Sequence, residues 1–469
     1  MIRPQLKRIS CWVCAVGLCV GSAVVAEPLS DQPGATGSLS LERAIALARQ
    51  QDPWLEGNRH AEQALNDLSV ASGSLPDPKV SVAFANLPTN TWDFDQEPMT
   101  QFKVGVTQMF PRGDQLALQR KQLQLSRAGK PFEREEREAE LRRRVSWLWL
   151  EAWRTQESIA LINRNRFLFE QMLEITQSSY SSAVGRTRQQ DVIRAQLELT
   201  RLEDRLTQLQ QQQDASLAQL SQWVGDVGEV GAQSDTGPAF RAAKPAYGLP
   251  RALPQITMLA PAQLLEQQHS DWQQLASRFL EHPSVRKLEQ DILASHAEAD
   301  LARQRYKPEW GVNASYGYRD DDPMGNQRAD FFSIGVSFDM PLFTGNRQDR
   351  QVSAAVAKVE TEKTRKWLRL KTMLSEFDEA RAQWQRLNER HELYKSRLLP
   401  QMHEQAEASL TAYTNDSGDF AEVMRARIAE LNAEIDALAI AARRQQLVAQ
   451  LNYYFAGSVA DQTGESHHE

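Results

Sequence analysis

Two short segments of alternating residues, separated by 230 positions, constrain the fold of this chain more than any other feature. The segment 331–347 reads FFSIGVSFDMPLFTGNR, in which bulky apolar residues alternate with small or polar ones as far as Met340, before Pro341. The segment 102–111, FKVGVTQMFP, has nearly the same pattern and also stops at a proline. Alternation with a period of two predicts a strand with one apolar and one polar face. The chain therefore contains the same type of strand twice.

The same offset joins further landmarks, which indicates that the two halves of the chain are duplicates. The corresponding pairs are Pro53 and Pro283, Pro78 and Pro308, Phe102 and Phe332, Gly105 and Gly335, and Pro111 and Pro341. Farther on, 185–196 matches 416–427 at an offset of 231. We predict a first repeat at 27–224 and a second at 263–456. A Gly- and Pro-rich linker or small equatorial subdomain at 225–262 joins them, and a disordered tail is expected at 457–469.

Each repeat follows one plan, a helix followed by two strands and a very long helical hairpin. We predict the first helices at 40–72, capped by Ser40, and at roughly 262–305. The strands are predicted at about 79–87, 101–110, 309–319 and 330–340. Apolar residues spaced alternately by three and four then form coiled-coil seams, as in Phe377, Ala380, Trp384, Leu387 and in Met424, Ile428, Leu431, Ile435. We expect kinks at Pro131 and Pro400.

The amino terminus has the pattern of a signal peptide. Arg3, Lys7 and Arg8 precede an apolar run, and small residues lead up to a predicted cut after Ala26, so 1–26 would be removed. All three cysteines lie in this segment, and the context of Cys19 is a poor one for lipidation. The net charge of −7 disfavours nucleic acid as a partner. No later run of about 20 apolar residues follows, so we predict no transmembrane helix.

Four strands with an apolar face need more than one chain to close a barrel, because about eight strands are the minimum. Three copies would supply twelve strands around a pore. Prolines then mark the joints between barrel and helices, namely Pro78, Pro111, Pro308 and Pro341. The pore side is predicted to carry Lys103, Asn313, Ser315 and Arg319. An aromatic belt at the membrane interfaces would use Trp310, Tyr316, Tyr318, Phe331 and Phe332.

The chain resembles the TolC-like outer membrane efflux proteins over nearly all of its predicted mature length. The resemblance rests on LSLERAIALARQQDP (39–53), LPDPKVSVAFANLP (75–88), VGVTQMFPRG (104–113), VSFDMPLFTGNR (336–347) and the two segments 185–196 and 416–427. It implies a mixed α and β fold and a homotrimer, in which a 12-stranded outer-membrane barrel continues as a periplasmic α-helical barrel. It also implies a Gram-negative outer membrane with its lipid, a periplasmic adaptor (membrane fusion protein) and an inner-membrane RND-type pump. LPDP…NLP and GDFAEV are most similar to the heavy-metal CusC/CzcC branch.

By this resemblance, Gly185 to Asp191 and Asp416 to Glu422 form the periplasmic turns at which the channel is gated. Tyr413 precedes the second turn as in family gates. Asp416 stands where the family usually has glycine, with Gly418 close by. Arg194 and Arg425 follow Asp191 and Glu422 by three residues on the same helix face. They form either solvated ion pairs with these carboxylates or a cationic lining of the periplasmic mouth.

No motif for catalysis, a cofactor or a metal site is present in the sequence, so we predict a protein that is not an enzyme. The eight histidines have no metal-ligand spacing, although His467 and His468 could bind metal loosely. We expect a passive exit duct of a tripartite efflux system for metal ions or small toxic compounds. The alternatives are a duct for type I protein or peptide secretion, and a periplasmic coiled-coil adaptor. Adaptors usually contain one helical hairpin, whereas two are predicted here.

Overall fold

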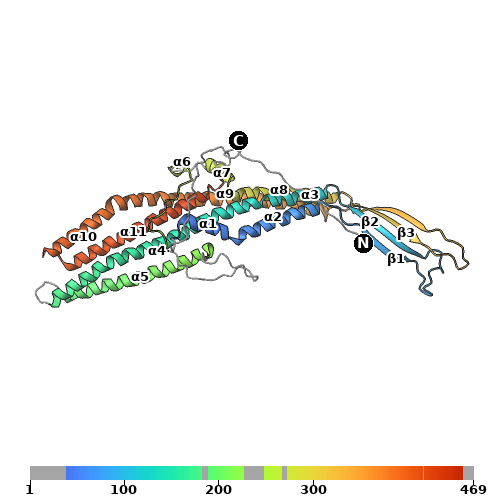
Figure 1. Cartoon of the computed structure of the whole chain (residues 1–469). Coiled ribbons are helices and arrows are strands. Elements are labelled where there is room, and N and C mark those ends of the chain that lie inside the picture. Colours follow the sequence, from blue (N-terminus) through green and yellow to red (C-terminus); the bar gives the residue numbers. More distant parts are fainter. Residues whose placement is uncertain (1–37, 182–187, 226–247, 267–271, 416, 458–469) are drawn as a thin grey trace, which may run out of the picture. The chain divides into compact units, whose positions relative to one another are not determined.

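The computed structural model describes residues 38–181, 188–225, 248–266, 272–415 and 417–457. The predicted signal peptide, most of the linker 225–262, Gly185, Asp416 and nearly all of the tail with its two histidines lie outside these residues. The described chain begins with α1 (Leu41–Gln51) and α2 (Pro53–Ser72), followed by strands β1 (Lys79–Ala85) and β2 (Gln101–Phe110). Helices α3 (Gln115–Ala128), α4 (Lys130–Ser181) and α5 (Gln189–Val224) complete the first half (Figure 1).

The second half repeats this order with additional short helices at its start. It comprises α6 (Ala262–Glu266), α7 (Trp272–Leu280), α8 (Pro283–Arg303), the short 3₁₀ turn η1 (Gln304–Tyr306), β3 (Trp310–Tyr318) and β4 (Phe331–Phe338). Helix α9 (Gln348–Leu393), the π-helical turn η2 (Tyr394–Leu398), α10 (Leu399–Thr414) and α11 (Phe420–Tyr453) follow. Each of the four strands lies within its predicted range. No helix among the described residues is long and apolar enough to cross a bilayer.

The first helix of each half is broken where we predicted a continuous one. Asp52 and His282 have extended backbone angles and act as N-caps of α2 and α8, and Pro53 and Pro283 occupy the first turn of these helices. Proline favours this position because it has no N–H to leave unsatisfied. The residue before a proline is restricted to extended angles, so the preceding helix must end there. The cap expected at Ser40 is present, since Ser40 Oγ accepts from Arg43 N.

Both predicted kinks fall at interruptions of the long helices. Gly129 separates α3 from α4, which begins one residue before Pro131. In the third arm, the π-helical turn η2 ends two residues before Pro400, and Pro400 lies in the first turn of α10. Proline cannot donate the helical hydrogen bond, so a local change of helix type at this position is the expected response.

The apolar seams are buried, but they join the two halves as well as the arms of one hairpin. One cluster unites Ile162 and Phe169 of α4, Leu202 of α5, and Met424 and Leu431 of α11. A second cluster packs Phe377 of α9 against Phe279 of α7 and Leu451 of α11. The core of the helical part therefore runs between the repeats. Residues 248–261 lie on this core in irregular conformation, since Leu249 packs with α4 and the Leu259 N–H bonds to Asn452 of α11.

Candidate functional site: the sheet faces and the hairpin tips

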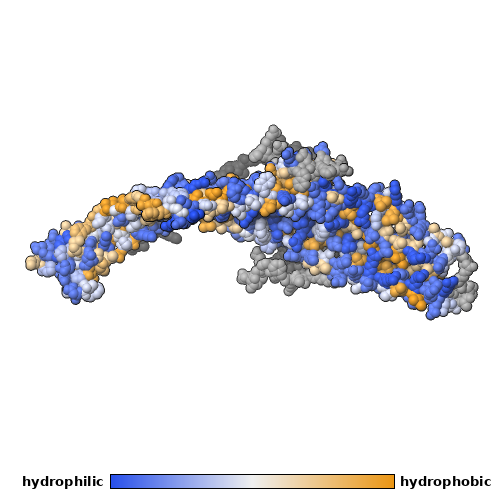
Figure 2. All heavy atoms as spheres, turned by 180° about the vertical axis from the view of Figure 1, so that it is seen from behind, coloured by the Kyte–Doolittle hydropathy of each residue, from blue (hydrophilic) through white to orange (hydrophobic). Residues whose placement is uncertain are grey.

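The four strands form one antiparallel sheet in the order β1-β2-β3-β4, and their register aligns most of the large apolar side chains on one face. One row across the sheet is Val82, Val104, Tyr316 and Phe332, and the next is Val80, Val106, Ala314 and Ile334. Phe332 and Ile334 are each 71% exposed in the single chain. No described helix covers this face, and part of the hydrophobic surface is visible at the left of Figure 2. The strands therefore present an unpartnered apolar surface.

The opposite face is lined by small and polar residues that lie close together. Its central row is Ser81, Gly105, Ser315 and Ser333, and Lys103 and Asn313 lie in the rows on either side. A Cβ atom added to Gly105 would lie 2.8 Å from Ser81 Oγ, and one on Gly335 would lie 2.8 Å from Asn313 Oδ1. Glycine at such positions marks close approach on the inside of a bent sheet. The sheet register places Lys103, Asn313 and Ser315 together on this face, as the alternation predicts.

Phe331 does not lie on the apolar face, as its predicted place in the aromatic belt requires. The register pairs Phe331 with Gly317 in the row of Lys103. The guanidinium carbon of Arg319 lies over the Phe331 ring, 4.0 Å from the ring centroid. Adjacent residues of a strand point to opposite faces, so Phe331 and Phe332 cannot both join one belt. Arg319 itself lies just past β3, where its side chain donates to Pro98 O and Ala329 O in the loops.

The four prolines predicted at the joints lie within three residues of the strand ends. A polar contact that the sequence did not reveal ties the ends of β2, β3 and β4 together. Pro111 directly follows β2, and Arg112 then donates to Lys307 O at 3.1 Å and pairs with Asp339. Asp339 in turn accepts from the Glu309 N–H at 2.7 Å. The strand ends of both halves are therefore tied by one arginine. The sequence signal for this contact was the position of Arg112 directly after the proline that ends β2, in the segment FPRG.

Apolar residues next to the two tips belong to one cluster. Asp191 Oδ2 accepts from the Arg188 N–H at 2.9 Å and so caps α5, while Asp419 caps α11. The Tyr413 ring meets the Phe420 ring edge-on at 5.8 Å. Phe420 shares its core cluster with Ala195 of α5, which brings the starts of both returning arms together.

The tip arginines do not form the ion pairs that were one of our two expectations. Asp191 uses its carboxylate as a helix cap, and no ion pair joins Glu422 to Arg425 in the described structure. Arg425 Nε instead donates to Ala421 O at 3.1 Å, and both Arg194 and Arg425 are exposed. The three-residue spacing placed each pair on one face, but capping and backbone contacts compete for the same groups. Cationic side chains at the tips therefore remain available to solvent.

Clusters of His, Cys, Asp or Glu with metal-binding geometry do not occur among the described residues. A cavity of about 440 Å³ lies between α4 and α8, next to Trp54, and is lined by both acidic and basic side chains.

Comparison with known proteins gives this arrangement a context. Residues 276–456 match the model of the family described as outer membrane efflux protein, and no curated protein matches the chain. A structure of CusC, described in terms of folding and transmembrane channel formation, superposes with a TM-score of 0.68 at 13% identity, covering 89% of this chain and 92% of that one. The fold is that of an outer-membrane channel subunit.

Two further channels agree with this assignment of the fold. VceC from Vibrio cholerae gives a TM-score of 0.68 at 14% identity, over 88% of this chain and 96% of its own. The CmeC outer membrane channel of Campylobacter jejuni gives 0.69 at 12% identity, over 91% and 89%. The likeness to CusC is no stronger than the likeness to these channels, so the heavy-metal branch is not distinguished by it.

Proposed function

We propose that this protein is the outer-membrane exit duct of a tripartite efflux system and works as a passive homotrimer. The observation that carries the proposal is the four-stranded sheet with one exposed apolar face and one closely spaced polar face. A lipid bilayer satisfies the first face and a water-filled pore satisfies the second. The fold shared with outer-membrane channels and the family match over 276–456 support the same conclusion.

In this proposal the helical hairpins form the periplasmic tunnel, and their tips form a gate. A periplasmic adaptor and an inner-membrane RND-type pump would open the gate and supply the energy. The segments around Asp191 and Glu422, with Tyr413 and Gly418, would form the gate region, and Arg194 and Arg425 would give its mouth a positive charge. The cargo would be metal ions or small toxic compounds, with the heavy-metal branch as the first candidate. No chemical step is required of any residue.

Fractionation of cells that make the tagged protein tests this proposal. We expect the mature chain in the outer-membrane fraction, resistant to extraction by salt and alkali, and conducting after reconstitution in planar bilayers. A chain found soluble in the periplasm would contradict the proposal. Deletion followed by growth on metals, dyes and antibiotics then identifies the cargo. If the deletion strain grows normally on all of these compounds but no longer exports a protein, the type I secretion duct is favoured instead.

A further inference from the structure

A buried polar cluster joins the two halves of the chain at the start of α8. His282 is the N-cap of α8 and its side chain is fully buried. Its Nε2–H donates to Tyr453 O of α11 at 3.0 Å, and Nδ1 accepts from Ser284 N at 3.3 Å. These contacts define a neutral imidazole with its proton on Nε2.

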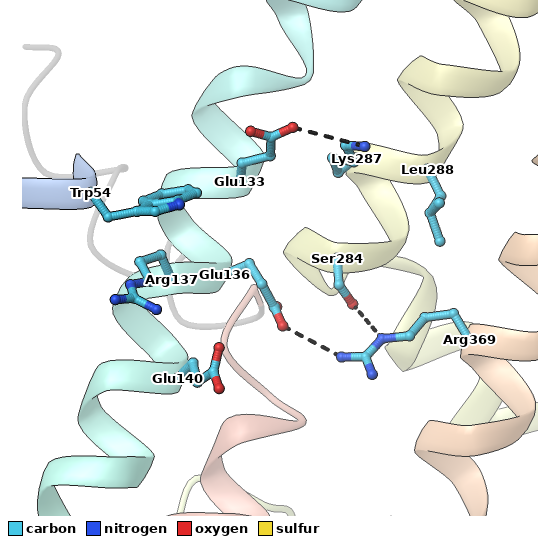
Figure 3. A pocket seen from close by; sticks show the side chains of 9 residues that line it. All are labelled: Trp54, Glu133, Glu136, Arg137, Glu140, Ser284, Lys287, Leu288 and Arg369. Carbon is cyan, nitrogen blue, oxygen red and sulfur yellow. Dashed lines mark hydrogen bonds and ion pairs between the residues drawn. The ribbon is translucent and has the colours of Figure 1, made fainter. Parts of the chain in front are cut away.

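The hydrogen bonds around His282 continue to α9 and α4. Arg369 of α9 donates to Ser284 Oγ at 3.0 Å and to Tyr453 Oη at 2.6 Å. The Tyr453 hydroxyl donates to Glu136 Oε1, and Glu136 is the one member that comes from the first half. Figure 3 shows the Glu136 carboxylate directed from α4 toward Arg369, beside Ser284. The other Glu136 oxygen, Oε2, is buried without a hydrogen-bond partner in the described structure, 3.5 Å from His282 Nδ1.

Protonation of His282 at Nδ1 removes the acceptor of the Ser284 N–H, which caps α8, and places a donor 3.5 Å from Glu136 Oε2, a contact that acts in the opposite direction. Burial of the imidazole decides between these two effects in favour of opening. Burial, together with the Arg369 charge, lowers the pKa of His282 to about 4, although the bond to the Tyr453 carbonyl acts in the opposite direction. An exposed histidine titrates near 6.5. A state that exposes His282 therefore binds more protons than the closed cluster, and is stabilised relative to it, as the pH falls from 6.5 to 4.

Burial raises the pKa of Glu136, and Glu140 adds to the rise, while Tyr453, Arg369 and Arg143 act in the opposite direction. That shift favours the closed cluster in acid and so opposes the effect of His282.

The corresponding cap in the first half is built without histidine. Asp52 caps α2 one residue before Pro53, as His282 caps α8 one residue before Pro283. Asp52 Oδ2 accepts from Arg137 Nε at 2.7 Å, and Arg137 is the neighbour of Glu136 on α4. One turn of α4 therefore contacts both caps, through an ion pair in one half and through the neutral histidine cluster in the other.

We propose that the cluster of Glu136, His282, Ser284, Arg369 and Tyr453 is an acid-sensitive clasp, in which protonation of His282 releases the start of α8 from α11 and α4. The duplicated halves would then be held less tightly against each other in an acidic medium. The clasp is a property of the helical part and does not depend on what passes through the protein.

Hydrogen exchange on the purified full-length mature chain in detergent tests the clasp without any transport assay. Exchange is measured at pH 7.5 and pH 5.0 and corrected for the intrinsic effect of pH. We expect amides in the first turn of α8 to lose protection at the lower pH, by at most the roughly thirtyfold that titration of His282 alone allows. Amides in the first turn of α2, capped by Asp52, serve as the internal control and should change little. Equal protection of α8 at both pH values would overturn the proposal.

Three variants separate titration from a simple structural role. His282→Asn keeps a capping oxygen but cannot titrate, so the pH effect at α8 should disappear. Glu136→Gln removes the opposing titration, so the loss should exceed that of the wild type. Glu135→Gln, which neutralises an exposed carboxylate next to Glu136 on α4, should behave like the wild type. A pH effect retained in His282→Asn contradicts the clasp. If that variant does not fold, a Glu136→Gln effect no larger than the wild-type effect contradicts it equally.

Discussion

At the scale of single residues, the second tip depends on one glycine for steric reasons. A Cβ atom added to Gly418 would lie 2.8 Å from Tyr413 N and 3.0 Å from the Ala412 carbonyl carbon, both of which are backbone atoms of α10. Backbone cannot move aside as a flexible side chain can. The sequence places Gly418 close to the predicted turn at Asp416, but it does not show which atoms approach the glycine, because that depends on how the last turn of α10 ends.

We therefore expect Gly418→Ala to lower the free energy of unfolding by about 1–3 kcal/mol through forced displacement of α10. Denaturant unfolding in detergent measures the change. Gly345→Ala is the matched control, because no atom lies within 4 Å of the added Cβ. Equal and small effects of the two substitutions would show that the tip accommodates the methyl group.

The exposed arginine of the second tip gives a prediction about ion selectivity. If Arg425 lines the periplasmic mouth, Arg425→Ala should shift the reversal potential in a salt gradient toward cation preference, because a cationic side chain near a constriction attracts anions. Planar-bilayer recording measures the shift. Arg278→Ala, which removes an exposed charge from α7, is the control. Unchanged conductance and selectivity in Arg425→Ala would exclude the lining role.

At the scale of elements, the spacing of apolar residues predicted which face of a strand or helix is apolar, but it did not predict which elements pack together. Period-two alternation placed all four strands, because one face of each is apolar and the other is not. Heptad spacing identified buried residues such as Phe377 and Met424, but it could not show that α11 packs against α4 of the other half. The breaks at Asp52 and His282 could have been predicted from the prolines that follow. The assignment of Phe331 to the aromatic belt was wrong, because the alternation of the strand places it on the polar face.

The joint between strands and helices rests on Arg112, which connects parts of both halves. Arg112→Ala should lower the free energy of unfolding by about 1–2 kcal/mol, since it removes a partly buried side chain that donates to Lys307 O and pairs with Asp339. Arg303→Ala is the control nearby, because its pair with Asp300 is exposed and such pairs contribute about 0–1 kcal/mol. Denaturant unfolding of both variants distinguishes the two cases. If Arg112→Ala lowers the free energy of unfolding no more than Arg303→Ala does, Arg112 does not stabilise the joint.

The two faces of β4 differ in what they should tolerate. Ile334→Arg places a charge on the apolar face, and Ser333→Arg places the same charge on the polar face next to it. We expect the first to reduce the amount of protein in the outer membrane, because a lipid-facing arginine costs about 2–4 kcal/mol. The second should leave that amount near wild type. Quantitative blotting of membrane fractions compares them, and an equal loss in both variants would argue against a lipid-facing side.

At the scale of the whole molecule, the sheet of one chain is incomplete. Strands β1 and β4 are its edges, and neither has a partner on its outer side in the described chain. Exposed edges promote association, and a closed barrel removes them. Sequence reasoning reached the need for several copies from the number of strands, but it could not show that the first and last strands are the edges. The structure therefore indicates where neighbouring copies would join in the proposed trimer, with β1 of one copy beside β4 of the next.

Disulfide cross-linking between these edges tests the central claim most directly. The only native cysteines are Cys11, Cys14 and Cys19 within the predicted signal peptide, so the mature chain offers no competing thiol. Ser81→Cys on β1 is combined in turn with Ser333→Cys, Gly335→Cys and Ser337→Cys on β4, since the stagger of a closed barrel decides which pair meets. We predict that at least one pair gives covalent dimers and trimers on oxidation in outer membranes, and no larger species. Monomers alone for every pair, or a ladder that continues beyond the trimer, would contradict the account.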